Sequence, residues 1–356
     1  MSHLFQPLSL RAVTFRNRAW VSPMCQYSAR DGLPNDWHFV HLGSRAIGGA
    51  GLIVAEATSV SPEGRISPSD TGLWNDAHLD AWSRVTRFAR DHGAAIGVQL
   101  AHAGRKASTR PPWKERGYVP PEEGGWVTVG PSPVAFGDLP SPREMTDADL
   151  RKVIEDFAAA TKRAVDAEFD VIELHAAHGY LLHQFLSHLS NQRTDGWGGS
   201  FERRIRLTLE VTRAVRQVWP EEKPLFVRIS ATDWVDGGWD VESSVELARR
   251  LKPLGVDLLD VSTGGVVPNA TIPVGPGYQV PFARAVRHGA EIATAAVGML
   301  TDAKQVEAYL AGGDADAAFL AREMLRDPYW PLHAAHALGE SIPWPVQYDR
   351  ARPVLD

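Results

Sequence analysis

The sequence predicts an α/β fold, a (β/α)8 TIM barrel, for a chain of 356 residues. Eight short apolar runs, helix-like segments between them, and the lack of a Gly-rich fingerprint after the first run predict it. Apolar runs of this length are typical of parallel strands that are buried on both faces. The runs cover residues 19–23, 52–57, 95–100, 171–175, 225–230, 258–262, 292–297 and 317–321.

Segments between the runs carry apolar residues at helical spacing, most clearly 76–91, 147–166 and 201–218. Asp147 and Thr301–Asp302 are expected to cap helices. Strand followed by helix, repeated about eight times, is the pattern of a barrel. A doubly wound sheet is the alternative, but it usually carries G-x-G-x-x-G after its first strand. Here that strand ends in Ser-Pro-Met-Cys.

We expect a single domain over residues 1–356, with an excursion at about 103–146 after the third strand and a C-terminal extension at about 336–356. A second long connection, 264–281, follows the sixth strand and is rich in Gly and Pro. Loops that follow strands lie at the carboxyl face of a barrel, where active sites are found. Long loops there are more often functional than surface padding.

Composition narrows the function classes. The net charge of −6 gives no basic field that would attract nucleic acid or an anionic membrane. No apolar run approaches the ~18 residues of a membrane-spanning helix. Cys25 is the one cysteine, which rules out an intrachain disulfide and a Cys-only metal site and fits a reducing compartment. We therefore expect a soluble cytoplasmic protein.

The densest chemical cluster begins where the fourth strand ends, with His175, His178 and Tyr180. Imidazoles can bind zinc or donate hydrogen bonds to a carbonyl or nitro oxygen, and a tyrosine can act as a general acid. A metal-dependent hydrolase that uses His175 and His178 is one alternative, although Arg228 nearby would repel a dication. The other alternative is a purely structural role, in which these polar residues have their hydrogen bonds satisfied at a strand end.

Gln99 and Arg228 lie near the ends of the third and fifth strands. A buried arginine needs an anionic or acceptor-rich partner, which the pyrimidine edge of a reduced flavin or an internal carboxylate would supply. A carboxamide can both donate to and accept from such an edge. Loops after strands seven and eight often bind phosphate, so Gly298 and Arg322 are candidates there. The alternative for Arg322 is a surface charge.

Taken together, these motifs resemble those of the Old Yellow Enzyme family of FMN-dependent ene-reductases, most closely its thermophilic-like branch. The resemblance covers nearly the whole chain. It is carried in order by residues 4–8, 16–18, 22–27, 99–106, 175–180, 190–200 and 345–348. One departure is Ala321 before Arg322, where the family usually has glycine.

The resemblance implies a barrel that holds FMN non-covalently. It assigns the flavin contacts to Ser22, Pro23, Met24, Cys25, Ala57, Gln99 and Arg228, and the phosphate contacts to Gly298 and Arg322. It makes His175 and His178 the residues that hold the activating oxygen of the substrate, and Tyr180 the proton donor. Tyr27 and Lys106 would line the substrate site.

The implied reaction is NAD(P)H-dependent reduction of the C=C bond of α,β-unsaturated carbonyl or nitro compounds, with NADPH the expected reductant. Hydride passes from FMN N5 to Cβ, and Cα is protonated. The resemblance also implies a homodimer or homotetramer in which Arg350, or alternatively Arg352, reaches a neighbouring active site. A non-catalytic flavin-binding protein is the remaining alternative, and the intact His-His-Tyr set argues against it.

Overall fold

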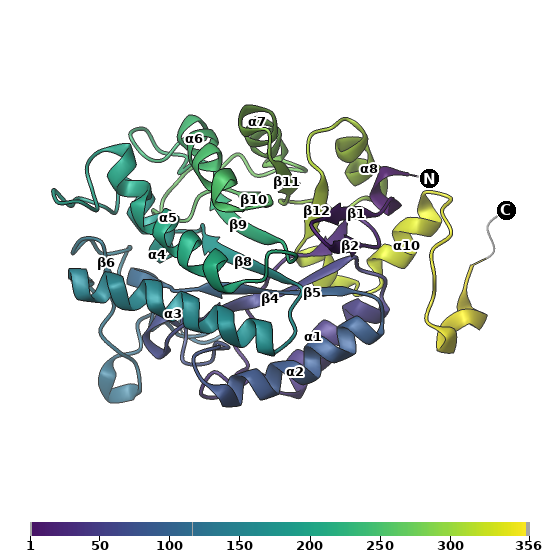
Figure 1. The fold of residues 1–356 in the computed structure, drawn as a ribbon, viewed down its shortest axis with the longest axis horizontal. Helices are drawn as coiled ribbons and strands as arrows, with labels where there is room; N and C mark the ends of the chain where they lie inside the picture. Colours follow the sequence, from purple (N-terminus) through teal and green to yellow (C-terminus); the bar gives the residue numbers. More distant parts are fainter. Residues whose placement is uncertain (1, 116, 354–356) are drawn as a thin grey trace.

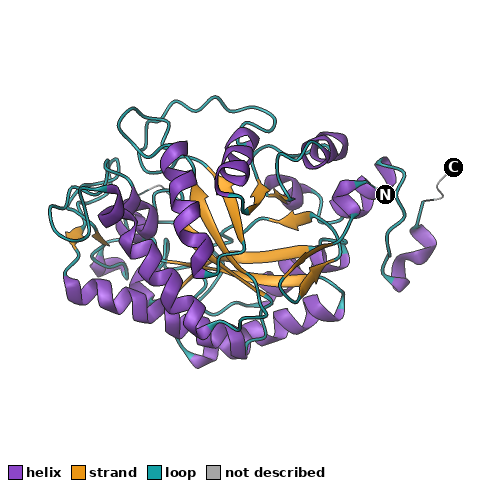
Figure 2. Ribbon diagram, turned by 45° about the horizontal axis from the view of Figure 1, so that its top comes forward, coloured by secondary structure: helices purple, strands orange, loops and turns teal. Residues whose placement is uncertain are grey.

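The computed structural model describes residues 2–115 and 117–353 and contains a closed barrel of eight parallel strands (Figures 1 and 2). The strands neighbour one another in the order β10-β11-β12-β3-β4-β5-β8-β9. They are β3 (Ala19–Val21), β4 (Leu52–Ser59), β5 (Ala95–Ala101), β8 (Val171–Ala176), β9 (Leu225–Ser230), β10 (Leu258–Ser262), β11 (Ala293–Ala296) and β12 (Ala317–Leu320). The predicted TIM barrel is confirmed, and the closed sheet excludes the doubly wound alternative.

Helices follow the strands and form the outer layer (Figure 2). They are α1 (Asp36–Ile47), α2 (Asp76–Asp91), α3 (Asp147–Asp166), α4 (Leu181–Leu186), α5 (Phe201–Val218), α6 (Val241–Leu251), α7 (Val280–Ala290), α8 (Ala303–Ala311), α9 (Arg322–Arg326) and α10 (Trp330–Ala337). Asp302 caps α8, as expected. Asp147 does not cap α3: Thr146 does, because its side chain and that of Asp149 form a reciprocal capping box.

An aromatic cluster fills the end of the barrel at which the strands begin. The hairpin of β1 (Leu8–Leu10) and β2 (Val13–Phe15) brings Phe15 to within 4.7 Å of Trp20, between ring centroids. Trp20 stacks on Phe226 at 5.8 Å and meets Phe319 edge-on at 5.4 Å. All four rings are fully buried. Side chains therefore fill this end of the barrel, and we expect a ligand site at the opposite end.

The carboxyl ends of the strands carry the long segments. Between β5 and α3 the chain forms two short 3₁₀ turns, η3 (Gly104–Lys106) and η4 (Pro121–Glu123). It also forms the paired strands β6 (Val129–Gly130) and β7 (Arg143–Glu144). The chain after β10 runs without regular structure until α7 begins. These segments surround the rim where the candidate site residues follow their strands.

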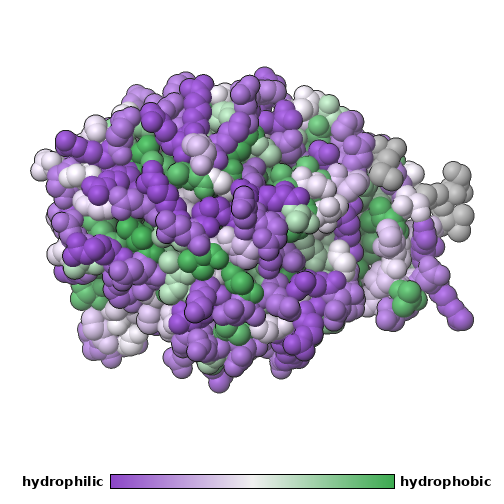
Figure 3. Space-filling view, viewed as in Figure 1, coloured by the Kyte–Doolittle hydropathy of each residue, from purple (hydrophilic) through white to green (hydrophobic). Residues whose placement is uncertain are grey.

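The C-terminal segment lies at the other end of the barrel. Residues 343–347 line a depression together with Arg16 and His92, which precede β3 and β5. The chain then forms η6 (Val346–Ala351) and projects away from the barrel (Figure 1). The visible face is mostly hydrophilic (Figure 3), and none of the helices that the structure describes is long and apolar enough to span a membrane.

We predict that replacing Phe226 by alanine costs about 3–5 kcal/mol of unfolding free energy, because it leaves a cavity beside the buried rings of Phe15 and Trp20. Urea unfolding of the flavin-free protein measures this. The matched control is Val218→Ala at the end of α5, where the side chain is 38% exposed and the expected cost is about 0.5 kcal/mol. Equal losses in the two variants would contradict the packed-ring account.

Candidate active site

Predicted site residues from separate strands meet at the carboxyl rim. Cys25 and Tyr27, which follow β3, pack with Tyr180, which follows β8, against a small apolar cluster that contains Ala57 of β4. Tyr27 also meets Trp113 of the long excursion edge-on, with ring centroids 5.7 Å apart. The rim thus combines residues that lie more than 150 positions apart in the sequence.

Two imidazoles and a phenol form the centre of this rim. The ring centroid of His175 lies 5.2 Å from that of His178 and 5.0 Å from that of Tyr180. Burial, followed by the charge of Arg228, lowers the pKa of both histidines well below the usual value, so both rings are neutral. Nδ1 of His175 accepts the N–H of Ala177 at 3.3 Å, which leaves its proton on Nε2.

The turn that carries His178 is held in a left-handed conformation. His178 has φ 58° and Gly179 has φ 70°. A Cβ on Gly179 would lie 2.1 Å from the carbonyl oxygen of Gly265, and one on Gly265 would lie 2.6 Å from Cα of His178. Glycine is therefore required at both positions, where the turn and the loop after β10 pack backbone to backbone. Strained backbone of this kind is common at functional sites.

Lys106 ties the same two segments together. Its Nζ donates to the carbonyl oxygens of His178 at 2.8 Å and Gly265 at 3.0 Å, and lies 5.0 Å from the ring centroid of Tyr180. Burial, then the charge of Arg105, lowers the pKa of this amine to about 7. The resemblance places Lys106 among the substrate residues, and the structure shows its amine engaged with the backbone beneath them.

His183, at the end of the histidine-rich run, lies on α4 and supports the turn that carries His178. It is fully buried, its Nδ1 accepts the N–H of Gly179 at 2.9 Å, and its Nε2 lies 3.0 Å from Oδ1 of Asp233. The other oxygen of Asp233 accepts from the hydroxyl of Ser187 at 2.6 Å. The sequence analysis did not identify Asp233, which anchors the turn through His183.

Gln99 and Arg228 lie inside the barrel with two carboxyl groups that the sequence analysis missed. Nε2 of Gln99 donates to Oε1 of Glu173 at 2.7 Å, and Nε of Arg228 lies 3.1 Å from Oδ2 of Asp260. Glu173 and Asp260 are fully buried. The alternative of an internal ion pair for Arg228 is thus present, yet Arg228 is also the register partner of His175 on β8, and its charge lowers the pKa of that imidazole.

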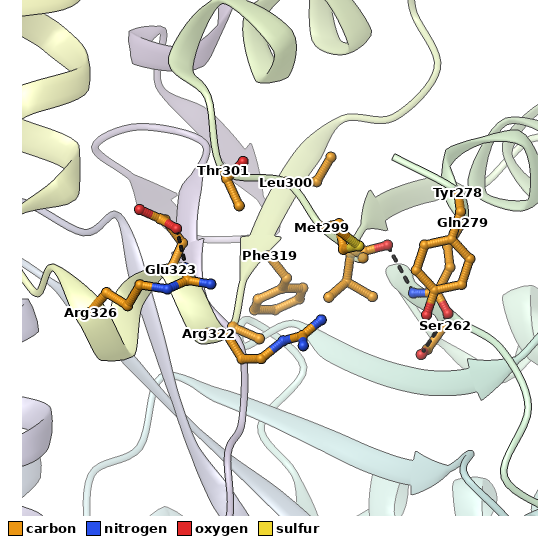
Figure 4. Close-up of a pocket in the computed structure, with 13 residues that line it drawn as sticks. Ser262, Tyr278, Gln279, Met299, Leu300, Thr301, Phe319, Arg322, Glu323 and Arg326 are labelled. Carbon is orange, nitrogen blue, oxygen red and sulfur yellow. Dashed lines mark hydrogen bonds and ion pairs between the residues drawn. The ribbon is translucent and has the colours of Figure 1, made fainter. Parts of the chain in front are cut away.

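A cavity of about 250 Å³ lies beyond β11 and β12 and includes the predicted phosphate residues (Figure 4). Gly298 has φ 116°, and a Cβ there would lie 2.7 Å from Nε2 of Gln279. Figure 4 shows Arg322 extending into the space, with Tyr278 and Gln279 on the opposite side. Ala321, the departure from the family pattern, also lines it.

Cys25 and Tyr180 are both neutral groups in this environment. Burial, followed by the nearby carboxylate of Asp70, raises the pKa of the Cys25 thiol well above its usual value. Burial also raises the pKa of Tyr180. The rim therefore presents a protonated phenol and a protonated thiol beside two neutral imidazoles.

These residues fit a bound FMN. The interior offers donors and acceptors for a pyrimidine edge in Gln99 and Arg228, and the cavity at Gly298 and Arg322 offers a site for a phosphate. The buried hydroxyl of Ser22, directly after β3, has no hydrogen-bond partner in the part of the chain that the structure describes. An unpartnered buried hydroxyl is costly unless a ligand satisfies it.

The remaining predicted residues divide between the rim and the far end. Pro23 follows Ser22, and Met24 packs against the main core. Arg350 lies in exposed η6, on the segment that projects from the other end of the barrel (Figure 1). It does not join the other site residues within one chain. The side chain of Arg352 donates to Ser341.

Comparison with known proteins identifies the family. Residues 3–340 match the NADH:flavin oxidoreductase / NADH oxidase family, and the chain belongs to it. It is 49% identical to an NADPH dehydrogenase of Geobacillus thermodenitrificans over 350 residues, with 98% of each chain covered. It is also 49% identical to an NADPH dehydrogenase of Bacillus licheniformis over 351 residues, again with 98% of each chain covered.

Comparison with solved structures supports the same family. Morphinone reductase superposes with a TM-score of 0.80 at 29% identity, covering 97% of this chain and 91% of its own. The Old Yellow Enzyme homologue of Zymomonas mobilis superposes with a TM-score of 0.78 at 26% identity, covering 99% of both chains. The predicted membership of the Old Yellow Enzyme family is confirmed.

The predicted class of reaction is confirmed by the same comparisons. The chain is an FMN-dependent NAD(P)H oxidoreductase of the ene-reductase class. The metal-hydrolase and non-catalytic alternatives find no support in the family.

We predict that Lys106→Met reduces stability in a pH-dependent manner. The lysine is protonated up to about pH 10.5 when unfolded but only up to about pH 7 when folded, so its titration makes the wild type more stable as the pH rises through 7. Between pH 6 and 9 the stability difference between wild type and variant should grow by about 2 kcal/mol in urea unfolding of flavin-free protein. A difference independent of pH would contradict the assignment.

Proposed function

We propose that this enzyme reduces the C=C bond of α,β-unsaturated carbonyl or nitro compounds at the rim formed by His175, His178 and Tyr180. The observation that carries the proposal is the meeting of these three rings at 5.0 and 5.2 Å, beside the buried Arg228. When bound, FMN supplies hydride chemistry, taking hydride from NAD(P)H and delivering it to Cβ of the alkene. Gln99, Arg228, Ser22, Cys25 and Ala57 would hold its ring system.

The histidines polarise the substrate. His175 offers Nε2–H, because its Nδ1 is engaged by the backbone. Nε2 of His178 lies 2.8 Å from the hydroxyl of Ser262. That hydroxyl also lies 3.3 Å from Oε1 of Gln279, but this oxygen already accepts from Thr263 at 2.6 Å. When the Ser262 hydroxyl donates to Nε2 of His178, the Nδ1–H of His178 is free for the substrate oxygen. Two neutral donors on one oxygen withdraw electron density from Cβ, and oxyanion donors of this kind each contribute about 2.7–4 kcal/mol of barrier lowering.

Tyr180 supplies the proton to Cα. Its phenol stays protonated because burial raises its pKa, and its hydroxyl belongs to a ring that packs beside His175. Cys25 is proposed to lie against the flavin as a neutral thiol, and Tyr27 and Trp113 to form the wall of the substrate entrance.

Arg350 is proposed to act in a neighbouring subunit. The segment that carries it lies at the end of its own barrel opposite to the site, so it reaches an active site only through a second copy. A homodimer or homotetramer follows. We also propose a reducing cytoplasmic location, which is supported by the single cysteine and by the need for NADPH.

We predict that Tyr180→Phe slows reoxidation of the reduced enzyme by 2-cyclohexenone by about 10²-fold or more, because the general acid is lost. Reduction by NADPH should stay nearly unchanged, since it needs no proton at Cα. Anaerobic stopped-flow absorbance measures the two half-reactions separately. Tyr118→Phe in the excursion is the matched control. Equal losses in both half-reactions would contradict the proton-donor role.

We predict that His175→Ala weakens the binding of phenols by about tenfold, because one hydrogen bond of about 1.5 kcal/mol to the phenol oxygen is lost. The long-wavelength absorbance that phenols induce in the flavin enzyme measures their affinity. His188→Ala, an exposed histidine near α5, is the control and should bind phenols as the wild type does. Unchanged phenol affinity in His175→Ala would contradict the assignment of His175 as a donor to the substrate oxygen.

A further inference from the structure

Two carboxyl groups that the reaction does not use are buried beneath the flavin-binding residues. Glu173 on β8 and Asp260 on β10 are both 0% exposed and lie on the two strands that neighbour β9; Asp260 is the register partner of Arg228, and Glu173 that of Phe226, two residues earlier on β9. They lie within hydrogen-bonding reach of each other. Nε of Arg228 lies 3.1 Å from Oδ2 of Asp260. Buried acids next to a cofactor site are expensive, so their protonation states need an account.

Charge balance is the first constraint. Two carboxylates beside one guanidinium would leave one uncompensated negative charge in the barrel interior. The other titratable group on the adjoining strand positions is His175, and it is neutral and offers no compensation. Burial, then the neighbouring Asp260, raises the pKa of Glu173, and burial raises the pKa of Asp260. Like charges in contact cannot both stay ionised at low cost.

Hydrogen bonding is the second, independent constraint. Oε1 of Glu173 accepts from Gln99 at 2.7 Å, but among the described residues its Oε2 and Oδ1 of Asp260 are buried with no hydrogen-bond donor, and Oδ2 of Asp260 has only the ion-pair contact with Arg228 at 3.1 Å. Two carboxylates offer only acceptors to each other. A proton on Oε2 of Glu173, donated to Asp260, satisfies an oxygen on each side. It also leaves the negative charge on the residue that is paired with Arg228.

We infer that Glu173 and Asp260 share one proton and act as a single buried negative charge that positions Arg228 in the flavin site. The triad is then neutral. One negative charge from the carboxyl pair balances the positive charge of the guanidinium, and no second negative charge is present. Arg228 can therefore stabilise the negative charge that develops at the pyrimidine edge on reduction. Glu173 and Asp260 are positioning residues, and their role toward the flavin rests on the proposed function.

The shared proton is tested first by infrared spectroscopy of the protein at neutral pH, loaded with FMN and flavin-free. A protonated carboxylic acid gives a C=O band that shifts in D2O. We expect this band in the wild type and its loss in both Glu173→Gln and Asp260→Asn, since a single remaining carboxyl beside Arg228 ionises. Asp70→Asn is the matched control: Asp70 is another buried acid whose pKa burial raises, so it gives a band of its own, and this variant identifies that band while leaving the band of the Glu173–Asp260 pair in place.

The midpoint potential of bound FMN is the second readout. If the pair carries one charge, each single variant keeps that charge and shifts the potential little. The double variant removes it and shifts the potential to more positive values by more than the sum of the single shifts. Additive single shifts would mean two full charges and would overturn the inference. So would a band that is absent, or that survives in either single variant.

Two features keep the test decisive. If an amide variant does not fold, Glu173→Asp retains the pair, and the band should persist at a changed frequency; its disappearance would count against the pair. The infrared result does not require FMN. A protein without flavin activity that shows the band refutes the proposed function alone, and an active enzyme without it refutes only the shared proton.

Discussion

Closing eight parallel strands into a barrel forces all of their carboxyl ends onto one rim, and the site depends on that constraint. Cys25, Gln99, His175, Arg228 and Arg322 come from five different strands or their ends. Nothing in their local sequence brings them together. The aromatic cluster around Trp20 fills the other end, so a ligand can enter only at the rim. Arg350, on the opposite side, is the one predicted substrate residue that does not lie near this rim.

The second organising feature is burial, which keeps several titratable groups of the site neutral. Burial is the first cause of the pKa shifts of Cys25, His175, His178 and Tyr180, and in every case it favours the uncharged form. Hydrogen-bond donors in buried surroundings act more strongly than in water, because the local dielectric constant is low. Arg228 places a buried positive charge beside them, which is why the carboxyl pair next to it matters.

Much of the fold could be predicted because buried strands leave continuous apolar runs and amphipathic helices leave a regular spacing. The eight strands were found, and α2, α3 and α5 have the predicted bounds. Glu173 and Asp260 were missed, since each is a single polar residue inside an apolar run and pattern reading treats it as noise. That interruption is itself the signal: a carboxylate within a fully buried strand needs a partner. The roles of Lys106 and Asp233 depend on contacts across the chain that no local pattern encodes.

The most direct test of the account is the anaerobic visible spectrum of the purified, FMN-loaded enzyme, first with NADPH and then with 2-cyclohexenone. The account predicts that the flavin bands bleach on addition of NADPH and return in proportion to the enone added. A protein that does not retain FMN would contradict the assignment of the rim and the phosphate cavity. Bands that bleach and stay bleached with enone would contradict the alkene chemistry assigned to the His-His-Tyr set.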